Sequence, residues 1–435
     1  MLVIIVQTCE ETQFTNKTMK NFILVVSLWL LASSFTEDPI KISVRDILTS
    51  VQKERRVTTS SQSLDFLNKL DYRIPILKDL GLKYGTDDLT NSRRQYSASF
   101  GFNTFKMIKE QQAIKSAQSS VYQAKRDLVL SLVVQERYMN IVDVHFTETI
   151  LSQQRTLDTF LNQKNTVLKT SLQKGIPIKV KDLVETEDDI RSLRVASAEM
   201  DNIRLLSYQR IKEYMGVQSP FTLVSNSFVT VAKLEEVLNG IKANRNYQTA
   251  ELKMSQSQMN LSQAELRLEE AAFKQFFDGF QLIYEHKNKT ELSTQDFSFR
   301  VGFNIPLKGN LRPKQNELLL DIKDAENDYQ MTFYETDRET KTQILRIENL
   351  IKQYRLCLES LNTSLSNSLL SNPLVLATLA PSDIIDLKII QQKKNIELVK
   401  SEFELVKEYI KLLDITGDLT YSPYRNFLSN SLEKW

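Results

Sequence analysis

The chain has 435 residues, of which 41% are hydrophobic, and it contains only 10 Gly, 9 Pro, 2 Cys and 2 His. This shortage of turn-forming residues excludes loop-rich β-sandwiches and propellers, and it predicts a protein built mainly from long helices. The 56 Lys and Arg residues balance the 54 Asp and Glu residues, so no nucleic-acid partner is expected, and the few Cys and His residues leave little material for a zinc cluster or a Cys/His catalytic pair.

An export signal is expected near the start of the chain. Met19 and Lys20 precede an apolar run of about ten residues, 22–31, and the small residues Ala32, Ser33 and Ser34 follow it. The run is too short to span a bilayer, so residues 1–34 are interpreted as an upstream segment and a signal peptide, with the true start at Met19. A buried N-terminal helix is the alternative interpretation.

Two short strands are expected next. In the segment 95–105 the residues Tyr96, Ala98, Phe100 and Phe102 alternate with polar residues or Gly. This period of two predicts a β-strand with one apolar and one polar face. A less regular partner strand is expected at 76–85.

Two helices of unequal length follow the strands. Residues 106–174 contain no Pro or Gly and could form a helix about 100 Å long. A returning helix of about half this length is expected at 180–215, before Gly216. The turn between the two helices is expected at Lys174, Gly175, Ile176 and Pro177.

The second half of the chain repeats this series. Gly101 and Gly302 lie in similar alternating segments 201 positions apart, and Gly216 and Gly417, which end helices, have the same offset. Internal duplication follows from these landmarks. The expected organisation is a first repeat at 35–216, an equatorial connection at 217–240, a second repeat at 241–417 with strands at 276–285 and 296–305 and helices at 311–371 and 383–416, and a C-terminal tail at 418–435.

The helices are expected to pack as antiparallel coiled coils, because alternating steps of four and three residues lead through a mostly apolar series: Ile385, Ile389, Gln392, Ile396, Val399 and Phe403. The fold class is therefore mainly α with a small β part. Four strands cannot bury a core alone. Either they form a small sheet packed on a helix, or they contribute to a shared barrel whose apolar face meets lipid.

The duplicated strand–strand–helix–turn–helix unit, the signal peptide and the stretch Gly302-Phe303-Asn304-Ile305-Pro306-Leu307 resemble the TolC-like outer-membrane efflux proteins. The resemblance covers residues 73–417 and is most specific over 246–307. It implies a homotrimer in which each copy gives four strands to one twelve-stranded outer-membrane β-barrel, while the helices form a hollow α-barrel in the periplasm. It also implies a periplasmic adaptor and an inner-membrane transporter as partners. The chain departs from the family pattern at Tyr247, where Pro is common.

The barrel interpretation assigns the strand residues to two faces by their alternation. The face toward lipid is expected to carry Phe297, Phe299, Val301, Phe303, Phe100 and Phe102. The face toward the lumen is expected to carry Ser298, Arg300, Asn304 and Asn103. Arg300 on the lipid side would cost about 2–4 kcal/mol at the middle of the membrane.

The turns far from the strands are expected to be functional ends. The resemblance implies that an adaptor binds the first turn and a second turn at Ala380, Pro381 and Ser382, which lacks the Gly usual in the family. It also implies that Asp383 and Asp386 line the periplasmic constriction of the closed channel. Their spacing places both carboxylates on one helix face. Three copies would supply two rings of carboxylates, and rings of this kind bind cations. Helix capping by Ser382 or Asp383, with Asp386 in the first turn, is the alternative.

Two functions remain open at this point. The first is a trimeric outer-membrane channel that is the exit duct of a tripartite efflux or type I secretion system. The second is an exported or intracellular coiled-coil scaffold or adaptor without a pore. No phosphate loop, nucleophile motif or metal-ligand spacing points to an enzyme or a cofactor. The resemblance leaves the cargo open among drugs, metal ions, lipids and polypeptides.

Overall fold

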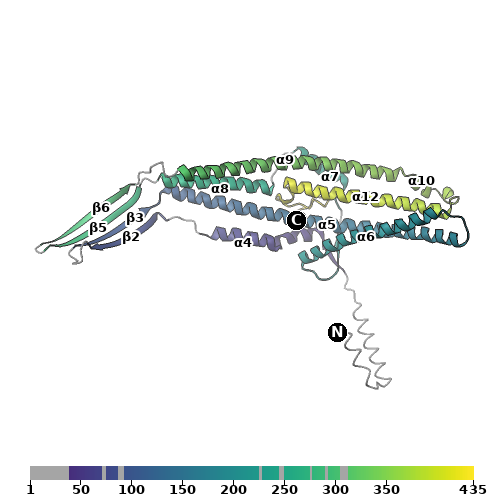
Figure 1. Ribbon diagram of the computed structural model, residues 1–435, viewed down its shortest axis with the longest axis horizontal. Coiled ribbons are helices and arrows are strands. Elements are labelled where there is room, and N and C mark those ends of the chain that lie inside the picture. Colours follow the sequence, from purple (N-terminus) through teal and green to yellow (C-terminus); the bar gives the residue numbers. More distant parts are fainter. Residues whose placement is uncertain are drawn as a thin grey trace, which may run out of the picture.

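The computed structural model describes residues 39–70, 75–86, 93–224, 228–243, 249–274, 277–289, 292–303 and 312–435. The expected signal peptide at 1–34, with its start at Met19, lies outside these residues, and so does Asn304. The molecule is elongated, with a β-sheet at one end and helical turns at the other (Figure 1).

The first half of the chain runs from the middle of the molecule to the sheet and back past the middle. Its elements are β1 (Ile40–Ser43), α3 (Val44–Thr49), the short helix η1 (Ser50–Lys53), α4 (Arg55–Lys69), β2 (Leu77–Thr86), β3 (Arg93–Phe102), α5 (Phe105–Gln173) and α6 (Val180–Met215). The connection to the second half contains β4 (Phe221–Val224) and α7 (Val231–Ala243).

The second half repeats the order helix, two strands, long helix and returning helix, with two short helices added before the returning one. Its elements are α8 (Ala250–Phe273), β5 (Phe277–Lys289), β6 (Leu292–Phe303), α9 (Arg312–Asn362), α10 (Leu365–Ser371), α11 (Pro373–Leu376), α12 (Pro381–Thr416) and η3 (Asp418–Thr420). None of the helices among the described residues is long and apolar enough to cross a membrane.

Short helices lie end to end beside long ones. The 69-residue helix α5 packs against α4 and α8 on the side of the sheet and against α6 and α12 toward the opposite end (Figure 1). Helix α9 packs against α8 and then α12 in the same way. A helix as long as α5 extends about 100 Å, so it sets the length of the helical body.

The duplication is visible in the helix boundaries. Helices α6 and α12 both have 36 residues, and their limits differ by the same 201 positions that separate the two capping glycines. Gly216 and Gly417 both have left-handed backbone angles, with φ of 65° and 81°. Gly adopts this conformation without the steric cost that a Cβ atom would bring, which explains why Gly ends both helices.

The second long helix differs from its expected course. The single helix expected at 311–371 ends at Asn362, and α10 follows after a break at Thr363 and Ser364. In the break, the Asn367 side chain donates a hydrogen bond to the carbonyl of Leu361 at 2.7 Å, and the hydroxyls of Ser364 and Ser366 bond to each other at 2.5 Å. Ser and Asn side chains compete with the helical backbone for its hydrogen-bonding groups and can interrupt a helix. A search for Pro and Gly alone does not detect a helix break of this kind.

The start of α12 also corrects an expectation. The helix begins at Pro381, with Ala380 as its N-cap, and no side chain caps it. Pro is well suited to the first helical position, because a backbone N–H there would have no acceptor within the helix. Ser382 and Asp383 therefore lie inside the helix, and the N-cap role considered for them is wrong.

The main hydrophobic core lies at the middle of the molecule. Buried residues of α3, α5, α6, α7, α9 and α12 meet there with Leu419, Phe427 and Leu428 of the C-terminal tail. A second, smaller cluster holds α5, α6 and α12 together nearer the turns and consists of Leu157, Leu161, Ile190, Ile389 and Ile396. A single chain thus derives most of its apolar stabilisation from its middle.

Candidate functional site

The four strands at one end form a single antiparallel sheet in the order β2-β3-β5-β6. Their register places apolar side chains in rows that cross all four strands. One row is Leu82, Ala98, Leu282 and Phe299, and the next is Tyr84, Tyr96, Tyr284 and Phe297. A third consists of Leu80, Phe100, Phe280 and Val301.

The aromatic rings of this face contact one another. The rings of Phe100 and Phe280 stack with centroids 4.8 Å apart, and Phe102 also stacks on Phe280 at 5.6 Å. The rings of Tyr284 and Phe297 lie 5.0 Å apart. Phe100 and Phe102 are therefore half-buried within the sheet's own apolar face.

The apolar face has no cover in the described part of a single chain. Phe297 is 81% exposed, Phe299 62% and Phe303 60%, and Val301 is also exposed. The sheet projects beyond the helices, and none of the described helices lies across it (Figure 1). The alternative of a small sheet packed on a helix is therefore wrong.

The opposite face of the sheet is mostly polar. Ser298 and Arg300 lie on it beside Ile283 and Gln281 of β5, and Gln95 donates a hydrogen bond to Glu285 at 3.1 Å. Asn103 follows β3 directly, and its side chain donates a hydrogen bond to the carbonyl of Pro75 at 2.8 Å. The alternation read from the sequence thus separates an aromatic face from a hydrophilic one.

A row of glycines crosses the sheet close to the helices. Gly101, Gly279 and Gly302 are direct neighbours on β3, β5 and β6. A Cβ atom on Gly279 would lie 2.0 Å from the carbonyl oxygen of Phe100, so only Gly fits there. The register of β5 with β6 shifts between Phe277 and Gly279, and a shift of this kind bends a sheet. Gly101 and Gly302 are recognisable in the sequence as equivalent positions of the two repeats, but their meeting with Gly279 depends on the strand register.

The turns at the other end expose the residues expected there. Gly175 has a φ of 72°, and Ile176 beside it is 51% exposed, so the turn after α5 presents an apolar side chain to solvent. Lys174 and Pro177 flank it and are exposed as well. On the second turn, Ala380 and Pro381 are exposed and Ser382 is half-buried.

The two candidate constriction residues have different surroundings. Asp386 forms an ion pair of 2.7 Å with Lys164 of α5, which joins the second hairpin to the first. Asp383 is exposed, and its carboxylate accepts a hydrogen bond of 3.4 Å from the Ser382 hydroxyl. One carboxylate is thus partly neutralised within its own chain, and the other faces solvent.

Ionic contacts at the middle of the molecule connect α4 to the long helices. The buried Arg137 pairs with Glu54, and its guanidinium lies 3.0 Å from the centroid of the Tyr214 ring. Glu136 accepts a hydrogen bond of 2.7 Å from Tyr214, and burial together with this bond raises the pKa of Tyr214 to about 12. Arg56 completes the group with a 2.6 Å bond to Glu136. These residues hold helices together and were not found from the sequence, because they are far apart in it.

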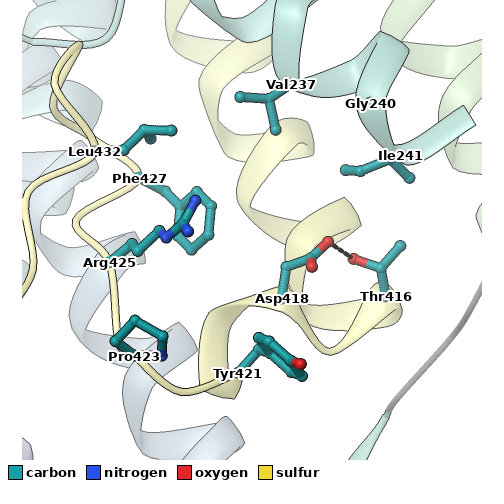
Figure 2. Close-up of a pocket in the computed structure, with 10 residues that line it drawn as sticks. All are labelled: Val237, Gly240, Ile241, Thr416, Asp418, Tyr421, Pro423, Arg425, Phe427 and Leu432. Atoms are coloured by element: carbon teal, nitrogen blue, oxygen red, sulfur yellow. Dashed lines mark hydrogen bonds between the residues drawn. The ribbon is translucent and has the colours of Figure 1, made fainter. Parts of the chain in front are cut away.

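A hollow of about 370 Å³ lies between α7, the end of α12 and the C-terminal tail. Figure 2 shows its apolar lining of Val237, Ile241, Phe427 and Leu432, with Asp418 bonded to Thr416 at one side and Arg425 at the other. The hollow lies at the middle of the molecule and contains none of the site residues expected from the sequence.

No family model matches the chain, and no curated protein sequence matches it. Several solved structures share its fold. The outer-membrane channel OprN is 10% identical with a TM-score of 0.61, and the match covers 86% of this chain and 89% of OprN. The open state of the Neisseria gonorrhoeae outer-membrane channel MtrE is 12% identical with a TM-score of 0.59, covering 86% of this chain and 88% of MtrE. The Vibrio cholerae outer-membrane protein VceC is 10% identical with a TM-score of 0.53, covering 86% and 96%.

Proposed function

We propose that this chain, which has the fold of the TolC-like outer-membrane channels, is itself a trimeric channel of the outer membrane. Three copies would join their sheets edge to edge into a barrel of twelve strands. The helices would continue this barrel as a hollow conduit through the periplasm. The fold is shared over 86% of the chain with channels such as OprN and MtrE, which supports the proposal.

One observation carries the proposal: the sheet has an uncovered aromatic face and two free edges. Among the described strands, β2 and β6 each have a neighbour on one side only. In lipid, each unpaired backbone group would cost several kcal/mol, so an open sheet there must close on itself or on other copies. Four strands are too few to close alone, whereas an aromatic outer face and a polar inner face suit a barrel built from several copies.

The partners follow from the same proposal. A channel without a nucleotide-binding motif needs an energy source elsewhere, which we assign to an inner-membrane transporter. A periplasmic adaptor would connect the two by binding the exposed turns at 174–177 and 380–382. The chain would then be the exit duct of a tripartite efflux or type I secretion system.

Membrane fractionation and gel electrophoresis test the assembly. We expect the protein in the outer-membrane fraction, migrating as a trimer in unheated samples and as a single chain after boiling. Light scattering in detergent should give three chains per particle. A soluble or salt-extractable protein that remains a single chain would support the coiled-coil scaffold instead.

We assign a gate role to Asp383 and Asp386 within this channel. Three copies would supply two rings of carboxylates at a narrow entrance, and such rings favour cations and are blocked by divalent ions. The double variant Asp383→Asn with Asp386→Asn should weaken divalent block of single-channel current in planar bilayers. Asp182→Asn with Glu185→Gln, at the equivalent positions of the first repeat, is the matched control. Unchanged block in the first variant would remove these residues from the gate.

A further inference from the structure

The turn between α5 and α6 carries an excess of positive charge. Residues 159–181 contain five Lys and no Asp or Glu. Lys164 and Lys169 form ion pairs with Asp386 and Glu187, at 2.7 and 2.9 Å. Lys174 and Lys179 flank the turn itself and are exposed, and no carboxylate of the described residues pairs with them. We call the segment 174–180 the basic tip.

Apolar side chains lie next to these two lysines, Ile176 between them and Val180 directly after Lys179. Ile176 is 51% exposed and Val180 is 66% exposed. The basic tip therefore presents two uncompensated cations around an apolar centre. A surface of this kind favours a partner that brings carboxylates next to apolar residues, because like charges there would repel.

The turn between α9 and α12 has a different chemistry. Residues 360–382 contain no Asp, Glu, Lys, Arg or His at all, in a chain that is 25% charged. Leu365 is 72% exposed and Leu374 is 81% exposed on α10 and α11. We call the segment 360–382 the neutral tip.

The neutral tip is an ordered structure. The ammonium of Lys394 on α12 donates hydrogen bonds of 3.1 Å to the carbonyl of Ser360 and to the hydroxyl of Ser364, at the point where α9 ends. Helix α10 then packs back on α12. Leu365 is thus carried by a helix that packs on α12, and positioning of this kind lowers the entropic cost of binding a partner.

Both tips lie at the end of the molecule opposite the sheet (Figure 1). The ion pair between Lys164 and Asp386 connects the two hairpins that carry them. One partner can therefore contact both tips at once.

We propose that the adaptor meets the two tips with two different chemistries: carboxylates beside apolar residues at the basic tip, and an uncharged apolar helix surface at the neutral tip. This inference rests on the proposed function, since it assumes that an adaptor binds this end. It specifies in addition which charge the adaptor carries at each tip. The lysines around Ile176 call for carboxylates, and the uncharged segment around Leu365 and Leu374 calls for an uncharged surface.

The test uses the full-length channel in detergent and two synthetic helical hairpin peptides as probes. The peptides are identical, with Leu at the positions next to their turn, except that the flanking positions carry Glu in one and Lys in the other. We expect the Glu hairpin to bind about tenfold more tightly than its Lys twin at low salt, and the difference to disappear at high salt, where exposed charges are screened. Equal binding of the twins, or binding of neither, overturns the proposal.

Two variants separate the contributions of the tips. Lys174→Glu with Lys179→Glu should reverse the preference between the twin peptides. Leu365→Gln with Leu374→Gln should weaken both peptides by a similar factor and leave the salt dependence unchanged. Lys352→Glu with Lys400→Glu, on exposed helix positions away from the tips, is the matched control for charge reversal.

Conductance separates this inference from the function on which it rests. A protein that conducts as a trimer but binds the twins equally loses only the assignment of partner charge. A protein that forms no trimer and no conducting pore contradicts the proposed function itself. A Lys174→Glu/Lys179→Glu variant that still prefers the Glu hairpin excludes the basic tip as the source of the preference.

Discussion

Lys164 connects the candidate gate to the rest of its own chain. Its ammonium lies 2.7 Å from the Asp386 carboxylate, and the two side chains are only 22% and 43% exposed. A pair of this exposure contributes about 1 kcal/mol or less to stability, but it decides how much negative charge Asp386 presents to an ion. In the proposed channel, Lys164 therefore weakens the carboxylate ring that Asp386 would form.

If Asp386 lines the entrance as proposed, removing the Lys164 cation should strengthen the binding of divalent ions there. We expect Lys164→Met to lower the concentration of divalent ion that halves the single-channel current several-fold, because Asp386 is then free to bind the ion. Lys169→Met removes a nearby lysine that pairs with Glu187 instead, and it should leave the block unchanged. Weaker block in Lys164→Met would show that Asp386 does not line the entrance.

Asp414 is a half-buried carboxylate near the end of α12. It accepts a hydrogen bond of 2.6 Å from the Ser131 hydroxyl. Burial raises its pKa, the bond from Ser131 opposes this rise, and the nearby carboxylate of Glu251 adds to it. A raised pKa in the folded state means that the fold favours the protonated form, so stability falls as pH rises from the unfolded pKa through the folded one.

Asp414→Asn should therefore stabilise the protein at neutral pH. The amide keeps an acceptor for Ser131 and removes a negative charge from a helix C-terminus, where it is unfavourable. We expect the melting temperature to rise by roughly 1–3 °C at pH 7 and the gain to vanish near pH 4, as followed by the helical circular dichroism signal. Asp143→Asn removes the negative charge that pairs with Lys407 at 2.9 Å, so this variant should lower the melting temperature instead. A lower melting temperature for Asp414→Asn at pH 7 would show that the charged Asp414 carboxylate does not destabilise the fold.

At the scale of elements, the sheet is the part whose two faces differ in chemistry, one aromatic and one mostly polar. Phe299 and Ser298 are neighbours on β6 and both are exposed in a single chain, but they lie on opposite faces. The proposed barrel places Phe299 in lipid and Ser298 in the lumen.

The same substitution on the two faces should have opposite outcomes. Phe299→Arg places a cation in lipid at a cost of about 2–4 kcal/mol near the middle of the membrane, so the yield of trimer in the outer membrane should fall strongly. Ser298→Arg should assemble at the normal level, because the lumen is wet. The intensity of the trimer band from unheated membranes measures the assembly of each variant. An equal loss of trimer in the two variants would argue against the assignment of faces.

At the scale of the whole molecule, the C-terminal tail connects the two repeats. The fully buried Tyr138 of α5 donates a hydrogen bond of 2.7 Å to the carbonyl of Arg425, and it accepts one of 3.3 Å from the backbone N–H of Phe427. Val229, next to α7, donates to the carbonyl of Leu428 at 2.8 Å. The tail thus completes the main core at the middle of the molecule.

Removing the Tyr138 hydroxyl should loosen the tail. Tyr138→Phe leaves the buried N–H of Phe427 without its acceptor, which costs about 1–3 kcal/mol. We expect limited proteolysis to cut the tail at least several-fold faster, because cleavage follows the population of the open form. Tyr122→Phe changes an exposed residue of the same helix and should leave the rate unchanged. An unaltered rate in Tyr138→Phe would show that the tail is held by other contacts.

The sequence by itself determined the features that depend on neighbouring residues. The period-two alternation around Phe299 predicted the two faces of a strand. The absence of Pro and Gly over the residues of α5 predicted a very long helix. Gly216 and Gly417 marked two helix ends 201 positions apart. The mainly helical fold with a four-stranded sheet was predicted correctly for this reason.

Only the tertiary structure decided what depends on residues far apart in the chain. The hydrogen bonds that Lys394 donates at the end of α9 come from another helix. The ion pair of Asp386 depends on Lys164, and the glycine row depends on the register of three strands. No local pattern encodes such contacts, because each depends on which segments the fold brings together and on the space left between them.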